Sequence, residues 1–227
     1  MKPKKCAIVS TPRSGTHYLR MSLDNHPKIS WTGEFFRKNT KSIFKSYERI
    51  KSYIYNDLCS TAINHFDCVG FVWHLTLESN LHPSKVDHFI LLKRKNILEH
   101  LCSLLIATKT GSWRDTRSTE KIELNIDQLK FFIDRQDKLY KDFENCGVKY
   151  KTVFYEDLCS NFDNTMNSIQ DYLGLEHFRI RPSKLKKQEN RKVQEIISNY
   201  EEVKWTLTDM NLLKTAIIPI GLQTQDM

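Results

Sequence analysis

The chain has 227 residues, of which 40% are hydrophobic and 11% aromatic, and this is the composition of a folded globular protein. The length suits one α/β domain with a full core, so we expect a single domain over residues 1–227. A formal net charge of +8 suggests a phosphorylated or polyanionic partner, although a basic solvated surface gives the same charge. No apolar run is long enough to span a membrane and no leader precedes the first predicted strand, so we expect a cytoplasmic protein without a membrane anchor.

Apolar, β-rich runs alternate along the chain with amphipathic segments of helical spacing. Strands are predicted from Cys6 onward and over residues 29–36, 68–75, 87–93 and 148–155, with a turn at Gly33-Glu34 in the second of them. Helices are predicted over residues 18–25, 39–64, 96–108, 124–144 and 162–173, and the tail 184–209 is basic and then helical. This alternation predicts an α/β fold of three layers, with a mostly parallel central sheet and helices on both faces.

The cysteines are scattered without the spacing of a metal site or a redox motif. They are Cys6, Cys59, Cys68, Cys102, Cys146 and Cys159. Several stand in apolar runs, so we expect buried free thiols in a reducing compartment rather than a disulfide framework, and no bound metal.

The most informative segment is the loop after the first strand, which combines hydroxyl side chains, one arginine and one glycine and then enters a helix. The backbone N–H groups of such a loop, and the positive end of its helix, point at an anion. Gly15 allows close approach of the backbone, and side-chain donors come from Arg13, Ser14, Thr16 and His17. The segment lacks both the Gly-Lys pair of nucleotide-hydrolase loops and the dinucleotide-binding glycine pattern, so it predicts another kind of anion site.

Two later segments also end predicted strands. Lys93-Arg94-Lys95-Asn96 places three consecutive cations at the carboxyl end of a strand, where doubly wound sheets bind ligands, and Ser103 follows on the next helix. A solvated strand end explains this pattern equally well. Tyr155-Glu156-Asp157-Leu158 closes the last strand, where Asp157 or Ser160 as a helix cap is the simpler explanation.

Taken together, the three segments resemble the sulfotransferase family, whose members use 3′-phosphoadenosine-5′-phosphosulfate (PAPS) as donor and release adenosine 3′,5′-bisphosphate (PAP). The resemblance extends from Cys6 to about Gly174, and the tail is similar to that of carbohydrate and nodulation-type members. It implies a fold like that of the P-loop nucleotide hydrolases.

The resemblance implies two sets of donor contacts. In the first, the loop and the start of its helix hold the 5′-phosphosulfate through Arg13, Ser14, Gly15, Thr16, His17 and Tyr18. In the second, later segments hold the 3′-phosphate and the rest of the donor through Arg94 or Lys95, Ser103, Tyr155 and Lys187. Lys95 stands where the family usually has arginine, so the choice between Arg94 and Lys95 stays open.

Sulfuryl transfer is an in-line displacement that depends on positioning and charge stabilisation. The resemblance implies that a hydroxyl of a carbohydrate or small molecule attacks sulfur while Arg13 stabilises the charge on the bridging oxygen, without a metal ion. The hydroxyl needs a general base. His74 at a strand end and Glu34 in Thr32-Gly33-Glu34-Phe35 resemble the bases of different family members. The tail favours Glu34, and both stay candidates.

Two other functions compete with this interpretation. A nucleotide or nucleoside kinase also has an N-terminal anion loop, but it should contain the missing Gly-Lys pair. A non-catalytic nucleic-acid-binding module would fit the charge of +8, but it would more naturally show a basic stripe with exposed aromatic residues. We therefore expect a nucleotide donor and a hydroxyl acceptor as partners, and no nucleic acid.

Overall fold

The computed structural model describes residues 3–34, 65–75, 86–111, 113, 121–184 and 191–210, with the backbone alone for residues 32–34. The chain divides into two compact units, of which the first comprises Met1–Lys93 and Leu139–Ser183 and the second Arg94–Lys138 and Lys184–Met227. This division follows from how densely the residues of each unit contact one another. It does not test whether the chain functions as one domain, so a single domain over residues 1–227 stays a prediction. Among the described helices, none is both long and apolar enough to cross a bilayer.

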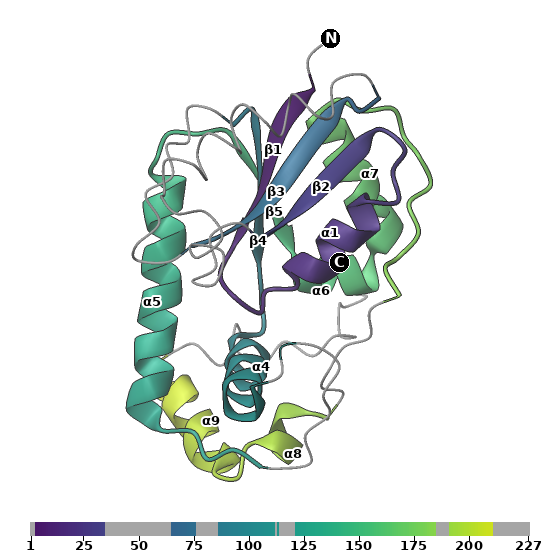
Figure 1. Ribbon diagram of the computed structural model, residues 1–227. Coiled ribbons are helices and arrows are strands. Elements are labelled where there is room, and N and C mark those ends of the chain that lie inside the picture. The colour runs from purple at the N-terminus through teal and green to yellow at the C-terminus, as the bar shows by residue number, and fades with distance from the viewer. Residues whose placement is uncertain are drawn as a thin grey trace, which may run out of the picture. The chain divides into compact units, whose positions relative to one another are not determined.

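The first unit is built on a five-stranded sheet in which every strand is parallel to its neighbours (Figure 1). In spatial order the strands are β2 (Ile29–Glu34), β3 (Cys68–His74), β1 (Lys4–Ser10), β4 (His88–Lys93) and β5 (Tyr150–Phe154). After β1 the chain continues to one side of the sheet, and after β3 it continues to the other. The loop after β1 therefore leaves the middle of the carboxyl edge at a switch point, where ligands of open α/β sheets bind.

Seven helices lie within the described residues. They are α1 (Thr16–Leu23), α4 (Ile97–Thr110), α5 (Ile126–Glu144), α6 (Tyr155–Ser160), α7 (Phe162–Leu173), α8 (Val193–Ile196) and α9 (Tyr200–Asp209). Asn96 caps α4 by accepting a hydrogen bond from the backbone N–H of Glu99 at 2.9 Å, and α7 ends at Gly174 in the left-handed conformation.

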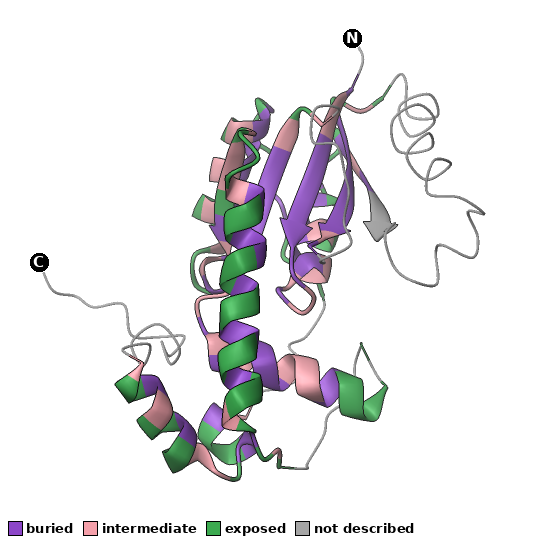
Figure 2. Ribbon diagram, turned by 90° about the vertical axis from the view of Figure 1, so that its left-hand side faces the viewer, coloured by how far each residue is buried: buried purple, intermediate pink, exposed green. Residues whose placement is uncertain are grey.

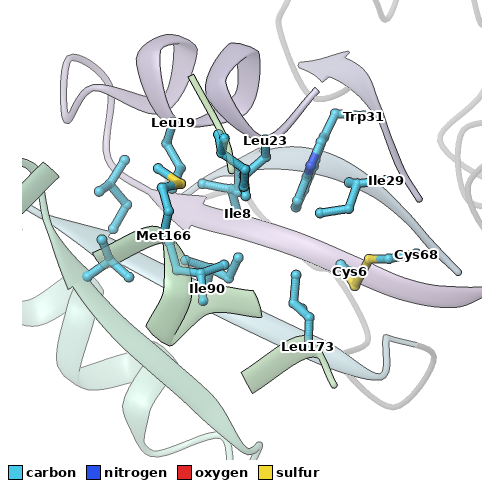
Figure 3. Packing of buried hydrophobic residues seen from close by; sticks show 14 of the residues in the cluster. Cys6, Ile8, Leu19, Leu23, Ile29, Trp31, Cys68, Ile90, Met166 and Leu173 are labelled. Carbon is cyan, nitrogen blue, oxygen red and sulfur yellow. A yellow bond between two sulfur atoms is a disulfide. The ribbon is translucent and has the colours of Figure 1, made fainter. Parts of the chain in front are cut away.

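Successive side chains of β1 enter two hydrophobic clusters, because neighbouring residues of a strand point to opposite faces. Cys6 and Ile8 pack in a cluster with residues of α1 and α7 (Figure 3). Ala7 and Val9 pack in the other cluster with the last turns of α5. Figure 2 shows the strands mostly buried and α5 carrying alternate buried and exposed faces. These layers confirm the predicted α/β fold with helices on both faces of a parallel sheet.

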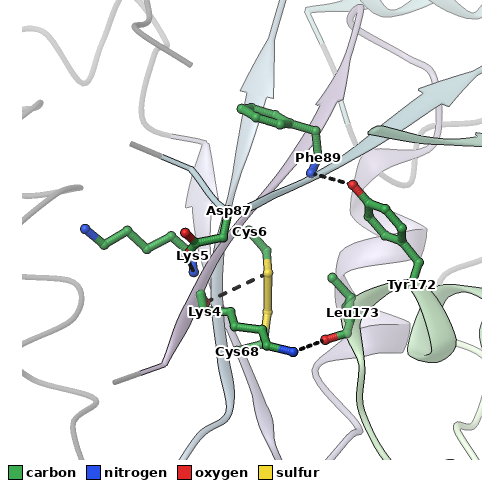
Figure 4. The surroundings of a disulfide bond; sticks show 8 residues. All are labelled: Lys4, Lys5, Cys6, Cys68, Asp87, Phe89, Tyr172 and Leu173. Carbon is green, nitrogen blue, oxygen red and sulfur yellow. Dashed lines mark hydrogen bonds between the residues drawn. A yellow bond between two sulfur atoms is a disulfide. The ribbon is translucent and has the colours of Figure 1, made fainter. Parts of the chain in front are cut away.

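Cys6 and Cys68 form a disulfide between β1 and β3 (Figure 4), so the expectation of free thiols is wrong for this pair. The register pairs Cys6 with Gly70 and Lys4 with Cys68, which makes the cysteines diagonal neighbours with Cα atoms 6.7 Å apart. Their separation of 62 residues hides this adjacency in the sequence. Cys102 is a buried thiol, Cys146 and Cys159 are exposed thiols, and Cys59 lies outside the described residues.

The second unit has a hydrophobic cluster of its own, formed by α4, the first turns of α5, α8 and α9. Leu98 and Val203 are fully buried in it. Asn199, before α9, connects the tail to the segment before α5: its amide donates to the carbonyl of Leu124 and accepts from the N–H of the same residue, both at 2.9 Å. The tail is thus an integral part of this unit.

The predicted strands and helices are confirmed within the described residues, with small shifts at their ends. The turn predicted at Gly33-Glu34 is wrong: both residues belong to β2, and an irregularity in the register between Trp31 and Glu34 accommodates them. The capping role considered for Asp157 or Ser160 is also wrong, because both lie inside α6 and Asn161 precedes α7. The helical segment predicted over residues 39–64 lies outside the described residues.

Candidate active site

The loop between β1 and α1 holds two residues in the left-handed backbone region. Arg13 has φ 69° and Gly15 has φ 93°, and Arg13 is the one non-glycine residue with positive φ in the described part of the chain. A non-glycine residue in this conformation is strained, and such strain gathers at ligand-binding sites. Left-handed residues in a turn also let successive N–H groups converge on an anion. The backbone geometry therefore fits an anion-binding loop.

The ring of Tyr155 covers the loop at Gly15. A Cβ atom on residue 15 would lie 2.3 Å from Cδ2 of Tyr155, a distance no real side chain tolerates. Tyr18 on α1 packs edge-on against the same ring, with centroids 6.3 Å apart. The structure thus brings Tyr155, which the resemblance assigned to the second set of contacts, against Gly15 and Tyr18 of the first set.

A second tyrosine contacts the loop from α5. The hydroxyl of Tyr140 lies 3.0 Å from Oγ1 of Thr11 and 3.5 Å from Oγ of Ser14, and it donates to the carbonyl of Leu92 at 3.2 Å. Burial raises the pKa of Tyr140, while hydrogen bonds from Ser14 and Thr11 act in the opposite direction. The phenol is therefore neutral at physiological pH. No local sequence signal marks Tyr140 as part of the site, because its partner Thr11 is 129 positions away.

His74 and Ser10 end the neighbouring strands β3 and β1 in register. Oγ of Ser10, which is fully buried, lies 3.2 Å from Nδ1 of His74. When Nδ1–H donates to Ser10, Nε2 carries a lone pair and is able to accept a proton. Ser10 can be found only from the pairing of β1 with β3, which places Ser10 and His74 opposite each other at the same edge of the sheet.

Glu34 ends β2, the next strand, and pairs through its backbone with Val72 of β3. Its carboxylate is outside the described part of the structure. Both candidate bases therefore come from strand ends on the same side of β1, at the carboxyl edge that also carries the loop.

The consecutive cations at the end of β4 have different surroundings. Lys93, in the first unit, forms an ion pair with Glu144, and its Nζ lies 4.9 Å from the centroid of the Tyr140 ring. Arg94, in the second unit, forms an ion pair with Glu99 at 3.1 Å, and its side chain is only 5% exposed. Lys93 and Arg94 thus each contact a carboxylate.

The remaining predicted donor contacts are placed as follows. Thr16 is buried at the start of α1, and His17 follows it half-buried. In the second unit, Lys95 and Ser103 are half-buried, before and within α4. Lys187 lies outside the described residues. Within the described part of the chain, no group of three or more His, Cys, Asp or Glu side chains is arranged to hold a metal ion.

Comparison with known proteins relates this geometry to one class of enzyme. No family model matches the chain. Nodulation protein H of Rhizobium tropici is 22% identical over 228 residues, covering 89% of this chain and 88% of that protein.

Solved sulfotransferase structures share the fold. A mouse sulfotransferase complexed with PAP has a TM-score of 0.57 at 13% identity, covering 94% of this chain and 90% of that chain. The sulfotransferase of Alicyclobacillus acidocaldarius gives 0.54 at 11% identity, with coverage of 94% and 95%. The sulfotransferase domain of the Synechococcus PCC 7002 olefin synthase gives 0.53 at 14% identity, with coverage of 78% and 75%.

The parallel sheet, with the loop between β1 and α1 at its switch point, gives the chain the α/β fold of the sulfotransferases. Nodulation protein H and the solved sulfotransferases support the family that the three motifs predicted, and a transferase of the sulfotransferase type.

Proposed function

We propose that the protein transfers the sulfuryl group of PAPS to a hydroxyl of a carbohydrate or small-molecule acceptor and releases PAP. The observation that carries this proposal is the loop between β1 and α1, with Arg13 and Gly15 in the left-handed conformation at the switch point of a parallel sheet. The sulfotransferase of this fold that is bound to PAP supports PAPS as the donor.

In this proposal the loop holds the 5′-phosphosulfate. The backbone amides and the start of α1 supply hydrogen bonds and positive potential, and Thr16, His17 and Tyr18 stand on the first turn of that helix. The guanidinium of Arg13 stabilises the negative charge that develops on the bridging oxygen as the bond to sulfur breaks. Preorganised donors of this kind supply much of the catalysis in group transfer between oxygens.

For the 3′-phosphate we favour Lys95 over Arg94, with Ser103 as a second donor. The side chain of Arg94 is only 5% exposed and forms an ion pair with Glu99. Its charge is therefore paired with a carboxylate in the first turn of α4. Using Arg94 for the phosphate would break this pair with Glu99, whose side chain is 18% exposed. Tyr155, which covers Gly15, completes the donor contacts among the described residues, and Lys187 is kept as a contact from the tail.

The acceptor hydroxyl loses its proton to Glu34 or to His74 as its oxygen attacks sulfur. The hydrogen bond between Nδ1 of His74 and Ser10 supports His74, because it fixes the imidazole ring with Nε2 directed elsewhere. The end of β2 at the same sheet edge supports Glu34. One of the two substitutions Glu34→Gln and His74→Ala is expected to abolish turnover while PAP binding survives.

A thermal-shift titration tests the donor. PAP at a concentration of 100 Kd should stabilise the protein by about 2.7 kcal/mol, and ATP should not. Stabilisation by ATP alone would indicate a kinase, and binding of an oligonucleotide without any response to PAP would indicate a nucleic-acid-binding module. Transfer from sulfur-labelled PAPS to a panel of carbohydrate and small-molecule hydroxyls then identifies the acceptor.

A further inference from the structure

We propose that Tyr140 is a positioning residue that holds the anion loop in its binding conformation, and that the Ser14 hydroxyl serves this network instead of donating to the anion. The proposal rests on the proposed function and revises the role that the family resemblance gave to Ser14. It concerns four residues of the first unit: Thr11, Ser14, Leu92 and Tyr140.

The network is buried and connects three elements. Thr11 and Ser14 are fully buried in the loop, and Tyr140 on α5 is 8% exposed. Oγ1 of Thr11 lies 3.0 Å from the Tyr140 hydroxyl and 3.2 Å from Oγ of Ser14. The Tyr140 hydroxyl donates to the carbonyl of Leu92 on β4, and the N–H of Thr11 donates to that hydroxyl at 3.4 Å.

Each hydroxyl has one hydrogen to donate, and this determines which group donates in each hydrogen bond of the network. A carbonyl only accepts, so Tyr140 uses its single hydrogen on Leu92. The shortest contact of the network then has Thr11 donating to the phenolic oxygen, and Thr11 in turn accepts from Ser14. Every hydroxyl hydrogen is then used inside the protein. Ser14 has none left for a phosphate, which accepts hydrogen bonds and does not donate them when fully ionised.

The ring of Tyr140 is itself held in place. Lys93, the residue after Leu92, places its Nζ 4.9 Å from the ring centroid and pairs with Glu144, one turn further along α5. A cation over an aromatic face stabilises the ring in that orientation. The first of the three consecutive cations therefore supports the network.

A loop that must present several N–H groups to a dianion binds more tightly when it is ordered beforehand, because ordering on binding costs free energy. Removing the Tyr140 hydroxyl leaves the ring packed but removes the hydrogen bonds that connect Thr11 and Ser14 to α5 and to Leu92. Tyr140→Phe should therefore weaken PAP binding roughly three- to ten-fold, the equivalent of one hydrogen bond.

Tyr172→Phe is the matched control. The Tyr172 hydroxyl accepts from the N–H of Phe89 at 3.3 Å (Figure 4). It also donates to the carbonyl of Lys149 at 3.0 Å. Burial raises its pKa, as it does for Tyr140. Both substitutions remove a phenolic hydroxyl that contacts β4, Tyr140 as the donor to the carbonyl of Leu92 and Tyr172 as the acceptor from the N–H of Phe89, which lies nearer the other end of that strand. Tyr172→Phe should lower the melting temperature similarly and leave the Kd for PAP unchanged.

A double-mutant cycle tests the role of Ser14. If Ser14 acts through the network, Ser14→Ala combined with Tyr140→Phe should weaken PAP binding little more than Tyr140→Phe alone. If the double variant instead loses affinity by the product of the two single-variant factors, Ser14 donates to the anion directly. That result would overturn the part of the proposal that concerns Ser14. Equal Kd values for Tyr140→Phe and Tyr172→Phe would overturn the other half.

Inorganic pyrophosphate is the second probe in the same calorimetric titrations. If the wild-type protein binds pyrophosphate but not PAP, the proposed donor is wrong, and the same variants still test the network through their pyrophosphate affinities. If it binds neither, the loop is not an anion site and both proposals are refuted.

Discussion

Tyr155 and Gly15 are in direct contact, although 140 positions separate them: the Tyr155 ring occupies the space that any side chain on residue 15 would need, with Cδ2 only 2.3 Å from the position of a Cβ atom. Tyr155 opens α6, and Tyr140 contacts the same loop from α5. The two tyrosines belong to helices associated with opposite hydrophobic clusters of the sheet, so the anion loop is held from both faces.

Gly15→Ala should abolish PAP binding and destabilise the fold. The new methyl group meets the Tyr155 ring, and φ 93° is unfavourable for alanine. Calorimetric titration and thermal unfolding measure the two effects. Gly147→Ala is the control, because Gly147 has φ 71° but nothing lies within 4 Å of its Cβ position. It should cost about 1–2 kcal/mol of stability and leave PAP binding intact. Normal PAP binding by Gly15→Ala would contradict the assigned loop.

The fold and the loop were predictable because their signals are local. The helix over Phe162–Leu173 ends as predicted at Gly174, whose φ of 63° few residues other than glycine adopt. The loop is likewise a short continuous segment between an apolar strand and a helix. Periodicity and turn chemistry therefore predict most of the architecture.

The contacts that complete the site were not predictable in this way. Nothing in the pattern of α5 distinguishes Tyr140 from Phe143, one turn away and equally core-facing, because the partner that gives Tyr140 its role is in another part of the chain. The same holds for Cys6 and Cys68, which only the pairing of β1 with β3 brings together. Such contacts depend on strand order, which the sequence does not encode locally.

Ser10→Ala should distinguish the two candidate bases. If His74 takes the proton, loss of the Ser10 hydroxyl removes the hydrogen bond at 3.2 Å that helps to orient its ring, and kcat should fall roughly ten-fold with little change in the KM for PAPS. If Glu34 takes the proton, kcat should stay near the wild-type value. Steady-state kinetics of Ser10→Ala, Glu34→Gln and His74→Ala provide the comparison. Near-normal kcat in both base variants would show that neither residue is the base.

Lys95→Met should weaken binding of PAP roughly 10- to 100-fold, the cost of losing a charged hydrogen bond to a phosphate. Adenosine 5′-phosphosulfate, which has no 3′-phosphate, should bind the variant and the wild type equally. Arg94→Met should instead lower the melting temperature, because it leaves Glu99 without the ion pair that spans 3.1 Å. A loss of affinity for PAP alone in Arg94→Met, and none in Lys95→Met, would assign the 3′-phosphate to Arg94.

The half-buried imidazole of His88 should make the folded protein less stable at acidic pH. Burial lowers the pKa of His88 from its usual 6.5, and the charges of Lys4 and Lys149 lower it further while Asp87 opposes them. The unfolded chain then binds a proton more readily than the folded protein. Stability from this group is therefore complete above about pH 6.5 and declines as the pH falls below that value towards the lowered pKa.

His88→Phe isolates this contribution, because phenylalanine can keep the edge-on packing against Tyr172, where the ring centroids are 5.2 Å apart. Thermal unfolding between pH 7.5 and about pH 5, at constant ionic strength, should show a shallower fall in melting temperature for His88→Phe than for the wild-type protein. His177→Phe is the matched histidine substitution, because His177 is exposed and contacts Asp171 at 2.6 Å, away from His88. Parallel curves for His88→Phe and the wild-type protein would show that His88 is protonated as readily in the folded state as in the unfolded one.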